Sequence, residues 1–191
     1  MRFDDGSAMR LYRQTIEDFG LYPGKELSDQ ELKMLKEAAG AMSAKMRAVR
    51  IVAASSVSKK DLQRRLVAKG EDPKQAQEAV QWMSDLELVD DKRVAEQIVS
   101  RCISKGYGLA RAKQALYEKQ IPKSYWDEAL ADYPDQTDEI MQYLRDHLGE
   151  QPEQKEKMRV INALIRRGHA YSTIRRAMER LCYDADDIPE E

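Results

Sequence analysis

The sequence predicts an all-α protein built as a tandem array of three three-helix repeats. Its composition favours helices, because Ala, Leu, Met, Gln, Glu, Lys and Arg predominate and only 9 Gly and 6 Pro occur in 191 residues. Apolar and basic positions also recur three times along the chain, at a period of about 50 residues. A pair of helices cannot bury its apolar face alone, so successive repeats must stack. We therefore expect an elongated, curved molecule.

The repeat register is set by aligning Gly70, Gln120 and Gly168, which lie at offsets of 50 and 48 residues. Five flanking columns then match, four of them apolar and one basic. They are Leu66, Leu116 and Leu164; Lys69, Lys119 and Arg167; Ala76, Trp126 and Ile174; Ala79, Ala129 and Ala177; and Val80, Leu130 and Met178. So many matching columns indicate a true internal repeat.

Each repeat is expected to hold a leading helix, a basic middle helix, a tight turn and a third helix. Ser58 and Asp61 predict the start of the first middle helix, and Gly70 suits the left-handed position at its end. The leading helices are expected at about 42–54, 91–104 and 136–148. Inward-facing residues of the middle helices are expected to be Leu62 and Leu66, then Leu109, Ala112 and Leu116, then Val160, Leu164 and Ile165.

The N-terminal segment differs from the repeats. Asp5-Gly6 between short mixed runs indicates a small hairpin, and Ser28 with Glu31 predicts a capping box. Apolar residues after it step by three and four as far as Val49, which predicts a helix that continues into the first repeat. The predicted division is an N-terminal extension (1–41), helical repeats 1 (42–89), 2 (90–134) and 3 (135–183), and an acidic tail (184–191).

Charge alternates along the chain with the repeat. The net charge is only -2, yet residues 42–69, 92–123 and 155–180 sum to +7, +6 and +6, while the stretches between and after them are acidic. Because acids are nearly absent from the basic helices, we expect their cations to be unpaired locally. Stacked repeats would then line them along one surface that attracts a long polyanion.

Other classes of site are not encoded. Cys102 and Cys182 match no zinc or disulfide spacing, and GLYPGK at 20–25 departs from a P-loop in its glycine spacing and in Glu26. His147 and His169 stand apart, and Asp90-Asp91 is explained by helix capping. We expect no catalytic, metal or cofactor site. No apolar run reaches the roughly 18 residues of a membrane span, and the N-terminus lacks signal-peptide character, so a cytoplasmic protein is expected.

Several aromatic side chains could stack on bases, including Trp82, Trp126 and Tyr125. Trp126 falls in a repeat column shared with Ala76 and Ile174, so we expect it in the core. Tyr107, between two glycines and close to Lys105, is the better candidate for an exposed contact.

Taken together, the chain resembles the RecX family of regulatory proteins from about Gly20 to Leu181. The resemblance rests on SKKDLQRRLVAKG (58–70), LELVDDKRVAEQIVSR (86–101), Tyr107-Gly108, RAKQALYEKQIP (111–122) and ALIRRG (163–168). Their order and spacing are specific, although each is short. Gln120, Val94 and His169 depart from the family's usual Gly, aromatic and Phe.

The resemblance implies tandem three-helix repeats and a non-enzymatic modulator of the RecA recombinase. Such a protein lodges in the groove of the RecA filament on single-stranded DNA and restrains ATP hydrolysis and strand exchange. Duplex DNA would be a weaker or nonspecific partner, no membrane is involved, and a monomer is expected. The alternative is a free-standing DNA-binding regulator that uses helix-turn-helix-like pairs, although no single recognition helix stands out.

The candidate residues for binding DNA or the recombinase filament combine repeat position with positive charge. They are Arg64, Arg65, Lys69, Arg101, Lys105, Tyr107, Arg111, Lys113, Lys119, Arg159, Arg166, Arg167 and Arg175.

Overall fold

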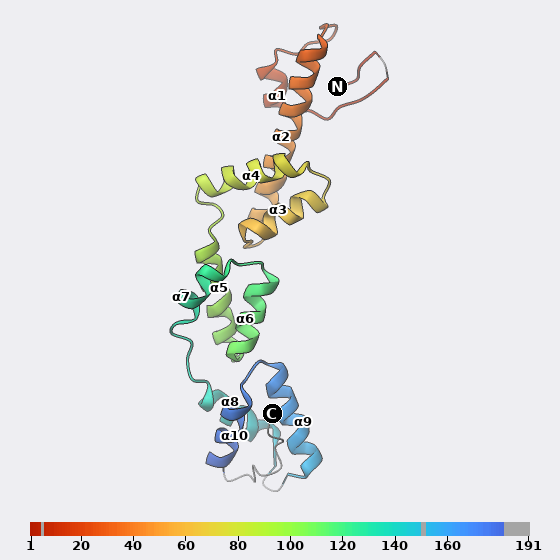
Figure 1. The fold of residues 1–191 in the computed structure, drawn as a ribbon. Helices are drawn as coiled ribbons and strands as arrows, with labels where there is room; N and C mark the ends of the chain where they lie inside the picture. The colour runs from red at the N-terminus through yellow and green to blue at the C-terminus, as the bar shows by residue number, and fades with distance from the viewer. Residues whose placement is uncertain (5, 150–151, 182–191) are drawn as a thin grey trace. The chain divides into compact units, whose positions relative to one another are not determined.

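The computed structural model describes residues 1–4, 6–149 and 152–181, in which helices alternate with turns and loops (Figure 1). They contain no strand; a single antiparallel bridge joins Arg2 to Ala8, around the predicted hairpin at Asp5-Gly6. None of the helices in these ranges is both long and apolar enough to span a bilayer. The chain forms two compact units, Met1–Asp91 and Lys92–Glu191, which are described in turn.

The first unit holds α1 (Arg13–Asp18), α2 (Asp29–Ala54), α3 (Lys59–Ala68) and α4 (Pro73–Asp85). Helix α2 begins at the predicted capping box: Ser28 Oγ accepts from the Glu31 N–H at 3.2 Å, and Glu31 Oε2 accepts from the Ser28 N–H at 2.8 Å. It continues without a break for 26 residues, which confirms the predicted continuous helix. The proposed boundary between 41 and 42 therefore falls inside a helix.

Helices α2, α3 and α4 pack against one another around a small apolar core. Ala44 and Ala48 of α2 meet Leu62 and Leu66 of α3 there. The small alanines let the helices approach closely, and the two leucines fill the space between them. Both leucines are fully buried, as their spacing predicted.

A buried carboxylate organises the start of α3. Asp61, with a side chain only 1% exposed, receives Arg64 Nη2 at 2.6 Å and Arg65 Nη2 at 2.9 Å. Burial raises the pKa of Asp61, but the two guanidinium groups outweigh it and hold the pKa below the ordinary 3.8. Asp91 Oδ1 accepts from the Lys59 N–H at 2.8 Å, so Asp91 caps α3 in addition to beginning α5.

The second unit contains the other two helical groups. The first comprises α5 (Asp91–Ser104), α6 (Leu109–Glu118), a 3₁₀ turn (η1, Lys123–Tyr125) and α7 (Trp126–Leu130); the second comprises α8 (Thr137–His147), α9 (Gln154–Arg166) and α10 (Tyr171–Arg180). The predicted core position of Trp126 is confirmed: its ring is half-buried against Val94, Val99 and Leu116, and its Nε1 donates to the Ile121 carbonyl at 3.1 Å. Cys102 is a free, buried thiol, whereas Cys182 and the acidic tail lie outside the described residues.

The repeat register is visible in the backbone. Gly70, Gln120 and Gly168 have φ values of 87°, 55° and 87°, so each middle helix ends on a left-handed residue. Gln120 therefore adopts the conformation that its glycine counterparts take without a side-chain penalty. The leucines four residues earlier, Leu66, Leu116 and Leu164, are all 0% exposed.

Two inward positions predicted from the sequence are wrong. Leu109 is 41% exposed and Ile165 is 43% exposed. Leu109 is the first residue of α6, where the chain enters from the Gly106–Gly108 loop, and the inward face of that helix is formed by Ala112 and Leu116. Ile165 follows the buried Leu164 by one residue, which is a rotation of about 100° and turns its side chain away from the core.

Within the second unit, a backbone contact joins the loop before α6 to the end of α9. The Gly108 N–H donates to the Arg167 carbonyl at 2.9 Å, and the Ala110 N–H donates to the Gly168 carbonyl at 3.2 Å. A Cβ added to Gly108 would lie 1.9 Å from the Gly168 oxygen. We call this contact the glycine joint. Only glycine at position 108 permits the approach.

Replacing Asp61 with Asn should destabilise the first unit by about 1–3 kcal/mol near neutral pH. The cost stays below that of breaking a fully buried pair, because the side chain of Arg64 is 60% exposed and can rehydrate. Since the folded pKa lies below the unfolded one, the contribution of Asp61 is present above about pH 4 and is lost as pH falls through the folded pKa. Urea unfolding of wild type and Asp61→Asn, from neutral to acidic pH, measures the difference in their free energies of unfolding.

The control for this prediction is Asp85→Asn. Asp85 is an exposed acceptor for Gln81, so its replacement should change unfolding by less than about 0.5 kcal/mol. A gap between wild type and Asp61→Asn that stays constant down to acidic pH would contradict the proposed charge interaction.

Gly108→Ala should destabilise the second unit by about 1–3 kcal/mol, because the new methyl group meets backbone that cannot rotate away. Amide hydrogen exchange at Ala110 should accelerate at the same time, since its hydrogen bond crosses the joint. Gly149→Ala, where a Cβ meets nothing within 4 Å, is the matched control and should be nearly neutral. Equal stability of the two variants would show that the joint is not required.

Candidate functional site

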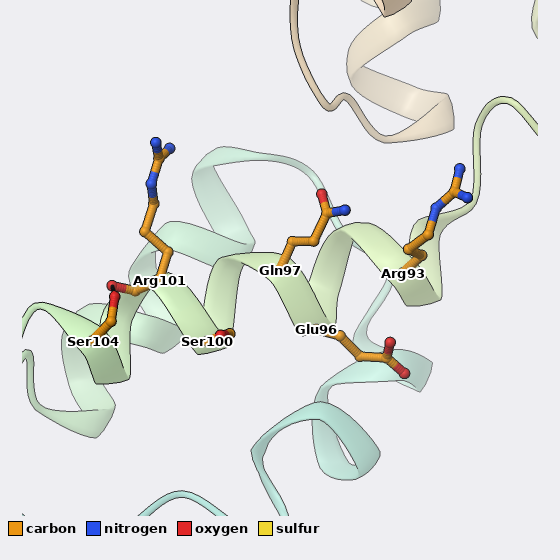
Figure 2. A pocket seen from close by; sticks show the side chains of 6 residues that line it. All are labelled: Arg93, Glu96, Gln97, Ser100, Arg101 and Ser104. Carbon is orange, nitrogen blue, oxygen red and sulfur yellow. Dashed lines mark hydrogen bonds between the residues drawn. The ribbon is translucent and has the colours of Figure 1, made fainter.

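One face of α5 carries a shallow polar hollow. It is lined by Arg93, Glu96, Gln97, Ser100, Arg101 and Ser104. Arg93, Gln97 and Arg101 follow one another at four-residue steps, so they share a helix face, and Figure 2 shows the three side chains extending to the same side while Glu96 extends to the other. The two arginines are about 12 Å apart along the helix axis. This face offers two guanidinium groups and an amide to an extended anion.

A second group of cations surrounds the end of α5. Burial raises the pKa of the Cys102 thiol, whereas Arg111, Lys105 and Arg101 favour its ionised form through their positive charge. These three cations come from α6, the loop after α5, and α5 itself. The fold thus brings together predicted residues that are up to ten positions apart in sequence.

Aromatic stacking fixes the loop that follows. The Arg167 Cζ lies 5.5 Å from the Tyr107 ring centroid and 5.2 Å from that of Tyr143, and Lys105 Nζ lies 6.0 Å from Tyr107. The Tyr143 ring stacks in turn on His147 at 4.0 Å. These are cation–π and stacking distances. The Tyr107 and Arg167 side chains therefore stabilise the second unit.

The loop backbone is held by three further side chains. Tyr133 Oη donates to the Tyr107 carbonyl at 2.6 Å, and burial raises the pKa of Tyr133 to about 12. Arg167 Nη2 donates to the Lys105 carbonyl at 2.9 Å, and His169 Nε2 lies 3.1 Å from the Gly106 carbonyl. Burial lowers the pKa of His169, against the opposing effect of its hydrogen bond to the Gly106 carbonyl. These hydrogen bonds fix the conformation of the loop that carries Lys105.

The expectation that the basic helices hold unpaired cations is wrong for several residues. In α3, Arg64 and Arg65 both bind Asp61, as described above. Other pairs are Arg111 with Glu118 at 3.2 Å, Arg159 with Glu156 at 4.0 Å and Arg175 with Glu179 at 3.1 Å. Each of these cations is paired with an acid one or two helical turns away. The net charge of a basic block does not reveal such pairing.

The structure divides the predicted site residues into groups. Arg101, Lys105, Tyr107, Arg111 and Arg167 gather around the loop in the second unit. The remaining ones lie on separate helices: Arg64, Arg65 and Lys69 on or just after α3, Lys113 and Lys119 on or just after α6, Arg159 and Arg166 on α9, and Arg175 on α10.

Sequence reasoning missed Arg93 and Gln97 in the hollow, and Arg47 in the first unit. The four-residue spacing of Arg93, Gln97 and Arg101 indicates a shared helix face, but a comparison of repeat columns does not reveal it, because such columns relate different helices and not the residues of one helix. Arg47 Nε contacts the buried Glu71 at 2.6 Å, a partner 24 positions away that no local pattern reveals.

Across 1–4, 6–149 and 152–181, no three His, Cys, Asp or Glu side chains converge closely enough to bind an ion.

Comparisons with known proteins agree on one family. A family model described as RecX, second three-helix domain, matches residues 90–130. The chain is 26% identical to regulatory protein RecX of Clostridioides difficile, over 97% of this chain and 90% of the relative. It is 23% identical to regulatory protein RecX of Streptococcus gordonii, over 100% of this chain and 76% of the relative.

Solved structures show the same fold. A crystal structure of regulatory protein RecX superposes with a TM-score of 0.70 at 19% identity, covering 93% of this chain and 92% of the other. RecX from Lactobacillus salivarius superposes with a TM-score of 0.65 at 19% identity, covering 75% and 97%. The all-helical repeat fold predicted from the sequence is thereby confirmed. The family model and the relatives aligned over nearly the whole chain all carry the name RecX, so the resemblance to the RecX regulatory proteins found in the sequence is confirmed.

Proposed function

We propose that this protein binds the RecA recombinase filament assembled on single-stranded DNA and inhibits its ATPase and strand-exchange activities, without a catalytic step of its own. Similarity to the RecX regulatory proteins supports a regulatory role. The observation that carries the DNA part of the proposal is the open face of α5, where Arg93 and Arg101 line the hollow and the exposed Lys105 follows directly after the helix.

The geometry of this region suits a phosphate backbone better than a small substrate. The α5 face is open and about 12 Å long between its arginines, which matches three to four stacked nucleotides at roughly 3.4 Å each. Lys105 extends from a loop whose carbonyls are already hydrogen bonded, so binding a strand there costs little ordering entropy. Glu96 points away from the arginine side and does not oppose an anion there (Figure 2).

The central test follows ATP hydrolysis by RecA on single-stranded DNA while this protein is titrated at fixed, near-physiological salt. Hydrolysis should fall as the protein is added. Inhibition well below one copy per recombinase protomer would indicate capping or disassembly of filaments, whereas inhibition only near saturation would indicate occupation along the groove. Unchanged hydrolysis at every ratio, with a folded protein, would refute the proposal and favour the free-standing DNA-binding regulator.

A charge-removal variant tests the DNA contact. Arg101→Gln, Lys105→Gln and Lys113→Gln in one protein remove three exposed cations that are not paired with buried acids. If all three contact phosphates, the slope of log affinity against log salt for single-stranded DNA should decrease by about 2, since each contact contributes roughly 0.7. Fluorescence anisotropy at several salt concentrations measures this slope.

The matched control removes the same charge elsewhere, with Lys33→Gln, Lys36→Gln and Lys74→Gln, all exposed positions of the first unit. Its salt slope should stay near that of wild type. If both triple variants lose the same slope, the DNA attraction is a general charge effect and the assigned contacts are incorrect.

A further inference from the structure

The last turn of α8, in the second unit, carries two stacked rings. The Tyr143 and His147 ring centroids are 4.0 Å apart, and the rings are nearly parallel, with 16° between their planes. Tyr143 is half-buried, whereas His147, the last residue of the helix, is exposed. One face of the imidazole therefore lies against Tyr143, and the opposite face is accessible to another flat group.

A hydrogen bond fixes the orientation of the exposed ring. His147 Nδ1 lies 2.8 Å from the Tyr143 carbonyl oxygen. A carbonyl oxygen can only accept, so Nδ1 carries the hydrogen and donates it. The stack and the hydrogen bond together hold the imidazole in one orientation before any ligand arrives. A ligand that stacks on such a ring loses little affinity to the ordering of the side chain.

The stacked rings are connected to cations of the same unit. The Arg167 guanidinium contacts the Tyr143 ring, with Cζ 5.2 Å from its centroid. Arg167 also contacts the Tyr107 ring at 5.5 Å, and Lys105 Nζ lies 6.0 Å from that ring. These printed contacts link the exposed imidazole to the loop that carries Lys105. A ligand stacked on His147 is therefore close to positive charge, which favours an aromatic group attached to an anion.

The charges on α8 itself do not oppose such a ligand. Arg145 is an exposed cation in the same last turn. The neighbouring acid, Asp146, accepts a hydrogen bond from Gln142 at 2.8 Å. One residue along an α-helix is a rotation of about 100°, so Asp146 leaves the helix in a different direction from His147.

Tyr117 is the other exposed aromatic residue in the described part of the second unit. Its side chain is 72% exposed, but no described ring stacks on it and no described cation lies over it. A base that stacked on Tyr117 would first have to order the side chain, which costs conformational entropy. Tyr117 is also next to an acid, Glu118. His147 is therefore the better prepared ring.

Phosphate contacts alone do not distinguish a single strand from a duplex. The arginines of the α5 face can meet phosphates, and both forms of DNA present phosphates. Bases inside a duplex are already stacked and paired, so their faces are closed to a side chain. Unpaired bases leave their faces open and stack on aromatic side chains. Selection of single strands thus requires an accessible ring in addition to the cations.

We propose that His147, held in place by Tyr143, is a stacking site for an unpaired base of single-stranded DNA. The proposal rests on the proposed function and deepens it, because it assigns the preference for single strands to a residue outside the α5 face. His147 touches the base, and Tyr143 is a positioning residue that supports the imidazole from its other face.

The test separates the base from the phosphate. Wild type and His147→Ala are titrated, at one salt concentration, with a base-bearing single strand and with an abasic strand of the same length. The ratio of the two affinities measures the contribution of the bases. His147→Ala should lower this ratio by about tenfold, as expected for the loss of one base stack, while its affinity for the abasic strand stays within about twofold of wild type.

Two further variants control for other causes. His147→Phe keeps a flat ring at the end of α8 and should retain most of the wild-type ratio, which a merely structural role for the imidazole hydrogen bond would not allow. Tyr117→Ala removes a more exposed ring of the same unit and should leave the ratio within about twofold of wild type. An equal loss of the ratio in Tyr117→Ala and His147→Ala would contradict the assignment to His147.

Three outcomes overturn the stacking site while leaving inhibition of the recombinase intact. They are an unchanged ratio in His147→Ala, an equal loss of affinity for both strands, and displacement of the strand by deoxyadenosine monophosphate at micromolar concentration. The last outcome would indicate a site for free nucleotides. Absence of any effect of the wild-type protein on recombinase ATP hydrolysis refutes the proposed function instead, and that assay does not depend on the affinity ratio.

Discussion

The left-handed residue at the end of each middle helix is the constraint on which the rest of the fold depends. Gly70, Gln120 and Gly168 reverse the chain there. That reversal brings the third helix of each repeat back onto the middle one and closes an apolar core over the leucine one turn earlier. It also sets which residues face outward, including the basic and apolar positions just before the turn. A right-handed residue at these positions would extend the helix and leave the leucine uncovered.

Buried acids give the alternating charge of the sequence a structural role as well as an electrostatic one. Asp61 and Glu71 bind Arg64, Arg65 and Arg47, and Asp91 caps a helix that begins 32 positions earlier. Asp61 and Glu71 neutralise these cations. Asp91 accepts a hydrogen bond from a backbone N–H at the start of α3 that would otherwise lack a partner. The surface that can meet a polyanion is therefore smaller than the count of basic residues implies. On α5, the loop after it and α6, the exposed cations include Arg101, Lys105 and Lys113.

The sequence was sufficient for the helices and the repeat, because these depend on local signals. The capping box at Ser28, the Asp72-Pro73 start of α4 and the left-handed residues all act within a few residues, and the structure reproduces them. The sequence was insufficient where contacts between residues far apart in the chain determine the position of a side chain. Nothing near Arg167 in sequence shows that its guanidinium contacts the rings of Tyr107 and Tyr143, so the sequence alone predicts a surface cation. The apolar character of Ile165 predicts an inward side chain, whereas the helical phase set by Leu164 turns it outward.

The glycine joint connects the loop before α6 to the end of α9 through main-chain atoms, and this determines how the protein can change over generations. A contact made by peptide groups does not depend on side-chain identity, apart from the need for glycine where the backbones meet. Neighbouring positions such as Lys105 and Lys113 can accordingly mutate without loosening the unit. The binding chemistry of this region can thus diversify to follow a changing partner, while Gly108 and Gly168 must remain small for the two backbones to meet.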